Sequence, residues 1–140
     1  MAIPSHEEQI RQKYARFQQL QQHIEQISAQ VEQMNQQQEE LEISKNAVAE
    51  LGNTAPDEEI LAPIANGIFF KAKLMDTQRF VINVGSNVTV EKSVSEVVDL
   101  LQKEQEKMTA RITEASAILE QLSEQALRIY KEVEKHVQQT

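Results

Sequence analysis

Apolar residues in the first third of the chain recur every seven residues, and this repeat constrains the fold more than any other feature. Two such series interleave with spacings of three and four, which is the a/d pattern of a coiled coil. Their members are Ile10, Phe17, Ile24 and Val31 in one series and Leu20, Ile27, Met34, Leu41 and Val48 in the other. We therefore predict one long helix over residues 5–51. Ser5 and Glu8 form its capping box, and Gly52-Asn53 provides a stop signal.

The last third of the chain carries a second a/d pattern and predicts a helix over residues 93–138. Its two series are Leu101, Met108, Ala115, Leu122 and Ile129, and Val98, Ile112, Leu119, Ala126 and Val133. The sequence Ser93-Val-Ser-Glu96 completes a capping box at its start. Polar side chains interrupt both patterns, at Gln38 and Lys45 in the first and at Gln105 in the second. Because neither apolar seam can remain in water alone, we predict that the helices pack as an antiparallel coiled-coil hairpin.

The segment between the helices, residues 52–92, changes to the shorter period of strands. Asn66-Gly67 and Gly85-Ser86-Asn87 are turn signals, and each lies between two short apolar stretches. We predict two β-hairpins, which make the fold α+β and predominantly α, in a single domain over residues 1–140. The segment has more apolar side chains than four short strands can bury, so we expect it to pair with the same region of other chains. The candidate assembly residues are Ile68, Phe70, Phe80, Ile82, Val84, Val88 and Val90.

Composition excludes several classes of function. The chain has 22 acidic against 14 basic residues and no long basic run, which argues against nucleic-acid binding. It has no cysteine, and no apolar run approaches the length of about 20 residues that spans a membrane. The N-terminus lacks the features of a signal peptide, so we expect a cytoplasmic protein. His6, His23 and His136 are scattered and no phosphate-binding motif occurs, so we expect no catalytic residue, cofactor or metal site.

The middle segment resembles the signature of the prefoldin α class. The resemblance rests on Leu61-Ala-Pro-Ile-Ala-Asn-Gly67-Ile-Phe-Phe-Lys71-Ala-Lys-Leu74, on Asp76-Thr77, and on Val84-Gly85 with Val88-Thr-Val-Glu91-Lys92. The order of helix, two hairpins and helix extends it over essentially the whole chain, although only the β motif is specific. The second turn of the family is often richer in glycine, and Asn87 can replace glycine there because it tolerates the left-handed conformation.

The resemblance implies a function. Archaeal prefoldin is a heterohexamer of two α and four β subunits, whose hairpins build inter-subunit β-barrels. Its coiled-coil tips hold unfolded client proteins without ATP, and the clients pass to a group II chaperonin. For this chain it implies a chaperone subunit with prefoldin β-type subunits as partners, no cofactor, and no contact with nucleic acid or membrane.

The residues themselves indicate where clients would bind. An antiparallel hairpin brings residues 3–20 beside residues 126–137 at its free end, where apolar side chains lie both on the seam and beside it. The candidate client-binding residues are Ile3, Ile10, Tyr14, Phe17, Ile129, Tyr130, Val133 and Val137. Four alternatives remain open: tyrosines that only pack on the stem, a β-segment that forms a self-contained cap, a tethering coiled coil without clients, and a self-assembling filament protein.

Overall fold

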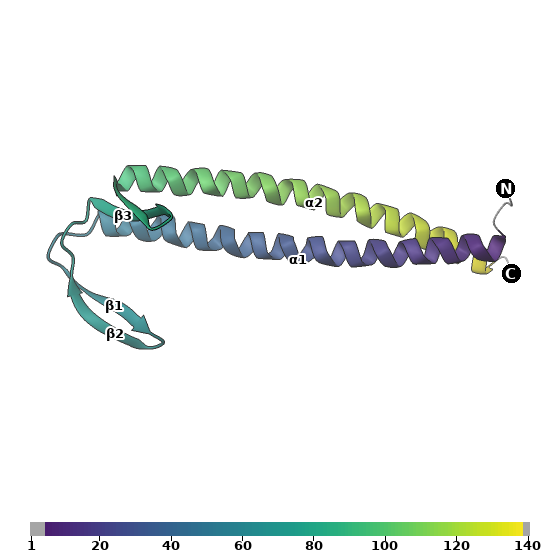
Figure 1. Cartoon of the computed structure of the whole chain (residues 1–140), viewed down its shortest axis with the longest axis horizontal. Coiled ribbons are helices and arrows are strands. Elements are labelled where there is room, and N and C mark those ends of the chain that lie inside the picture. Colours follow the sequence, from purple (N-terminus) through teal and green to yellow (C-terminus); the bar gives the residue numbers. More distant parts are fainter. Residues whose placement is uncertain (1–4, 139–140) are drawn as a thin grey trace. The chain divides into compact units, whose positions relative to one another are not determined.

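The computed structural model describes residues 5–138 and contains two long helices joined by two β-hairpins (Figure 1). Helix α1 covers His6–Gly52 and helix α2 covers Val94–Gln138. Between them lie strands β1 (Glu59–Ala65), β2 (Ile68–Lys73), β3 (Arg79–Gly85) and β4 (Val88–Ser93). The predicted fold class and order of elements are confirmed. The chain divides into two compact units: α1 through Gln37 with α2 from Met108 onward, and the segment Gln38–Lys107.

Both helices begin at the predicted caps. The Ser5 hydroxyl oxygen accepts a hydrogen bond from the Glu8 backbone N–H at 3.3 Å. At α2 the box is reciprocal, because the Glu96 N–H donates to the Ser93 hydroxyl at 3.2 Å and the Ser93 N–H donates to the Glu96 carboxylate at 3.4 Å. The Ser93 hydroxyl also donates to the Glu96 carboxylate, at 3.0 Å. These contacts lower the pKa of Glu96, chiefly through the Ser93 hydroxyl. Satisfying the first free N–H groups fixes where each helix starts.

In the first unit, the N-terminal part of α1 and the C-terminal part of α2 run side by side in opposite directions (Figure 1). The predicted seam residues of this unit are buried or half-buried, and Leu20, Ile27 and Ala126 are the most enclosed. An ion pair of 3.1 Å joins Lys13 of α1 to Glu132 of α2. The a/d pattern therefore identified the packed faces correctly, because a seven-residue period keeps one stripe of each helix against its partner.

The second unit contains a polar layer where the a/d pattern is interrupted. The Lys45 ammonium donates to the side-chain oxygens of Gln105 at 3.0 Å and Gln102 at 3.1 Å, and it pairs with Glu42 at 3.1 Å. The Gln105 amide donates to Glu42 at 2.6 Å, and its backbone oxygen accepts from the Gln38 amide at 3.2 Å. Gln105 is only 8% exposed, so these bonds satisfy a polar group inside the seam.

The strands form two separate two-stranded antiparallel sheets, β1 with β2 and β3 with β4. Both predicted turns are present, at Asn66-Gly67 and Ser86-Asn87. Ser86 and Asn87 have φ angles of 50° and 62°, the combination that a tight type I′ turn requires, so the prediction for Asn87 is confirmed. Each pairing has an irregularity just before its turn, and in the first sheet it follows Pro63, which lacks a donor for the ladder.

Helix α1 ends at Gly52, one residue beyond the predicted end at 51, and the reason is not a left-handed cap. Gly52 is not among the residues with a positive φ angle. A Cβ atom added at this position would lie 2.9 Å from a methyl carbon of Val94, at the start of α2. The Gln78 side-chain amide also donates to the Gly52 backbone oxygen at 2.9 Å. The Val94 backbone N–H donates to the backbone oxygen of Gln78 at 3.2 Å. Glycine is thus required here for close approach of the two helix ends.

Candidate functional site

An apolar hollow lies beside the seam near the chain termini, within the first unit. Its volume is about 450 Å³, and its lining is Tyr14, Phe17, Tyr130, Val133, Val137 and Glu134. A neighbouring hollow of about 430 Å³ shares two of these residues and is otherwise lined by Gln21, Ile24, Glu25, Ser123, Ala126 and Leu127. Because Phe17 and Tyr130 line both hollows, we treat the two hollows as one surface and call it the tip groove.

Aromatic side chains from both helices form the middle of the tip groove. The rings of Phe17 and Tyr130 lie 6.0 Å apart between centroids, with an interplanar angle of 39°. Phe17 is half-buried in this arrangement, whereas Tyr130 is 54% exposed and Tyr14 is 55% exposed. Leu127 and Val137 are also exposed by more than half. An apolar surface of this kind, contributed by two helices and left open to water, is typical of an interaction site.

The opposite side of the same helix pair is polar. A third hollow, of about 320 Å³, is lined there by Gln9, Gln12, Lys13, Arg16 and Ile129. Its lining carries two cations, whereas none of the described residues that line the tip groove is cationic. Apolar surface is therefore concentrated on one side of the unit.

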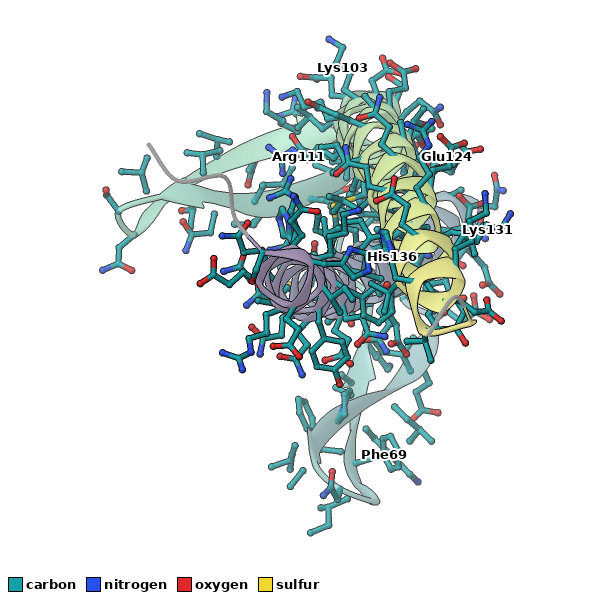
Figure 2. All side chains as sticks on the ribbon, turned by 90° about the vertical axis from the view of Figure 1, so that its right-hand side faces the viewer. Phe69, Lys103, Arg111, Glu124, Lys131 and His136 are labelled. Atoms are coloured by element: carbon teal, nitrogen blue, oxygen red, sulfur yellow. The ribbon has the colours of Figure 1, made fainter. Side chains whose placement is uncertain are left out.

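Two histidines lie at the outermost turns of the pair. The rings of His6 and His136 are 4.4 Å apart between centroids and nearly perpendicular, at 79°. Figure 2 shows His136 between α2 and the N-terminal part of α1. Its Nδ1 atom is buried and has no hydrogen-bond partner among the described residues. Within residues 5–138, no three side chains of the types that ligate metals gather into a site.

The structure brings five of the eight predicted client-binding residues together. Tyr14, Phe17, Tyr130, Val133 and Val137 line the tip groove, whereas Ile10 and Ile129 lie half-buried at the seam. The prediction for Ile3 falls outside the described residues. Sequence reasoning missed the two carboxylates of the groove, Glu25 and Glu134. The heptad pattern could have indicated both carboxylates, because Glu25 directly follows the seam residue Ile24 and Glu134 directly follows the seam residue Val133.

The hairpins of the second unit form a separate candidate surface. Of the predicted assembly residues, Ile68, Phe70, Val84 and Val88 are exposed, whereas Phe80, Ile82 and Val90 are half-buried. Ile82 pairs with Val90 across the second sheet. Further exposed apolar residues of the hairpins, outside the set of candidate assembly residues, are Leu61, Ile64, Phe69 and Val81. Figure 2 shows Phe69 on its hairpin. Isolated two-stranded sheets with so many exposed apolar side chains are poorly stable alone, which is typical of a surface that another chain covers.

Comparison with known proteins identifies the family. The family model of the prefoldin subunit matches residues 20–139. The chain belongs to the prefoldin family. Prefoldin subunits are chaperone components and not enzymes, in agreement with the sequence prediction. No helix within residues 5–138 has the length and apolarity needed to cross a bilayer.

Its curated relatives are α subunits, which confirms the predicted class. The chain is 33% identical over 93 residues to prefoldin subunit alpha 1 of Methanocaldococcus jannaschii, a match that covers 66% of this chain and 65% of that protein. It is 32% identical over 98 residues to prefoldin subunit alpha of Methanothrix thermoacetophila, covering 70% of this chain and 64% of that protein. The chain therefore spans somewhat less than two thirds of the length of these relatives. A solved structure titled as filamentous PFD from Methanocaldococcus jannaschii is similar, with a TM-score of 0.47, 19% identity and coverage of 96% of this chain and 99% of that chain.

Proposed function

We propose that this chain is a chaperone subunit that holds unfolded proteins in the tip groove without ATP. The observation that carries the proposal is the exposed aromatic surface of Tyr14 and Tyr130, beside a seam that is otherwise closed. An unfolded protein offers scattered apolar side chains, and covering apolar surface recovers about 25 cal/mol per Å². A groove of this size binds any one segment weakly, which suits a protein that must release its client without an energy source.

Several tips acting together would supply the affinity that one groove lacks. We propose that the hairpin surface of the second unit provides this assembly by pairing with prefoldin β-type subunits, in a heterohexamer of two α and four β chains with inter-subunit barrels. The support is the exposure of Ile68, Phe70, Val84 and Val88. Linked weak sites gain avidity without new contacts. Within this proposal the chain acts as one prefoldin-like domain in the cytoplasm, and its clients pass to a group II chaperonin.

Aggregation assays test the client site. The full-length chain, in the assembly that it forms, is mixed with a chemically unfolded enzyme during dilution, and light scattering is followed. Replacing both tyrosines, Tyr14→Ser with Tyr130→Ser, should weaken the suppression of scattering and leave helix content unchanged, because both side chains are more than half exposed. The matched control is Ile43→Ser, which removes an exposed apolar side chain of α1 outside the groove and should have no effect. A native chain that fails to suppress scattering would favour the tethering alternative.

A further inference from the structure

The charged residues that line the tip groove are acidic. Glu134 lines its outer hollow and Glu25 its inner hollow, and among the described residues that line either hollow none is a lysine or arginine. Two cations of α1, Lys13 and Arg16, line the hollow on the opposite side. Arg11 occupies the same heptad position as Glu25, two heptads earlier, but does not line the groove.

Both carboxylates are available to a ligand. Within residues 5–138, neither Glu25 nor Glu134 takes part in an ion pair of 4.0 Å or less, whereas Lys13 is already paired with Glu132. Both residues are exposed. A cation brought by a bound segment therefore meets unpaired negative charge at either end of an apolar surface.

The distance between the carboxylates sets the length of a segment that reaches both. The Lys13–Glu132 and Phe17–Tyr130 contacts fix the level of α1 against α2 in this unit. They place Glu25 level with residues 120–122 of α2, about 13 residues before Glu134. At about 1.5 Å per residue, the two carboxylates are separated by about 20 Å along the groove. An extended chain covers this distance in about six residues.

We propose that the tip groove prefers extended client segments in which about six mainly apolar residues are flanked by lysine or arginine. The apolar core lies on Tyr14, Phe17, Tyr130 and Leu127, and the flanking cations lie near Glu25 and Glu134. This inference rests on the proposed function and adds a charge preference to it. An exposed ion pair changes an affinity by roughly 1.5- to 5-fold, so two pairs produce a preference of several-fold over a segment with acidic flanks.

Two labelled peptides test the preference. Each has the same core of six alternating leucine and phenylalanine residues, and the flanks are either lysine or glutamate. Binding to the full-length chain, in its assembly, is measured by fluorescence anisotropy at low salt. The native chain should bind the lysine-flanked peptide several-fold more tightly. The ratio should fall toward one at about 0.5 M salt, because screening weakens exposed pairs.

A pair of matched variants distinguishes an effect of the groove carboxylates from an effect of the overall negative charge of the chain. Glu25→Gln with Glu134→Gln should bring the ratio close to one. Glu40→Gln with Glu124→Gln changes the net charge equally and should leave the ratio unchanged. Glu40 and Glu124 are exposed, and Figure 2 shows Glu124 on the side of α2 turned away from α1. Equal loss of preference in both variants would overturn the inference.

The remaining outcomes distinguish this inference from the proposed function. Equal binding of both peptides by the native chain, abolished in Tyr130→Ser, would overturn the charge preference and leave the client site intact. Failure of the native chain to bind either peptide would overturn both proposals.

Discussion

The polar layer of the second unit should behave as one coupled group rather than as separate contacts. Lys45 and Gln105 occupy seam positions that are apolar elsewhere in the heptads, and each also contacts Glu42. The perturbation is a double-mutant cycle of Lys45→Met, Gln105→Met and the combined variant. Methionine is unbranched and close in length to both side chains, so the cycle removes polar atoms with little change in packing.

The contacts set the expected magnitudes. Lys45→Met leaves the Gln105 side-chain oxygen and the Glu42 carboxylate without the ammonium, and Gln105→Met leaves the half-buried ammonium beside an apolar side chain. Because Lys45 and Glu42 are partly in water, each single change should lower the free energy of unfolding by only about 1 kcal/mol. The combined variant replaces the interhelical polar pair by apolar packing. It should be at least as stable as the native chain. The coupling is then about 2 kcal/mol.

Urea unfolding followed by circular dichroism at 222 nm measures these free energies. The pH dependence adds an independent check, since donation from Gln105, followed by Lys45, lowers the pKa of Glu42. A carboxyl whose pKa is lower in the folded state stabilises the fold above its unfolded pKa, and this stability is lost as the pH falls through the folded value. The free energy of unfolding that is lost at acid pH should therefore be smaller in Gln105→Met than in the native chain. Additive effects of the two substitutions, with no coupling, would refute the account of the layer.

Three further predictions concern the helix ends and the hairpins. Ser93→Ala removes the cap of α2 and should lower the free energy of unfolding by about 1 kcal/mol in urea titrations; an unchanged midpoint would contradict the capping role. Gly52→Ala places a methyl group against Val94 and should lower the thermal midpoint, and Val94→Ala in the same chain should restore it; a Gly52→Ala midpoint at or above the native one would refute the close-approach argument. Val84→Asp introduces charge on the exposed hairpin surface and should dissociate the assembly in sedimentation velocity while helix content persists. The control Asn83→Asp, at a polar position next to it, should leave the oligomer unchanged.

The sequence was sufficient to predict the helices and their packed faces, because burial in a coiled coil follows a period. The series beginning at Ile10 and Leu20 predicted which residues are enclosed, and even the polar interruptions at Lys45 and Gln105 proved to face the partner helix. The local sequence was equally informative where a single arrangement satisfies the free backbone N–H groups at a helix start, as in the reciprocal cap of Ser93 and Glu96.

Other features depend on contacts that have no period. The two walls of the tip groove, Glu25 and Glu134, come together only through the level at which α1 meets α2, and the heptad does not fix that level. The need for glycine at position 52 comes from its close approach to Val94, which is distant in sequence. On the hairpins, alternation distinguishes the two faces of each strand, but the strand sequence alone does not decide which face another chain would cover.

Site-specific crosslinking tests most directly whether clients occupy the tip groove. A photoreactive benzophenone amino acid replaces Tyr130 in one variant and Arg128 in another. These positions lie two residues apart and face opposite sides of α2, at about 100° per residue, and Arg128 is exposed like Tyr130. After irradiation of the assembled chain with an unfolded enzyme, adducts should form from position 130 and be nearly absent from position 128. Equal adducts from both positions, or adducts only from position 128, would contradict the assignment of the client site to the groove.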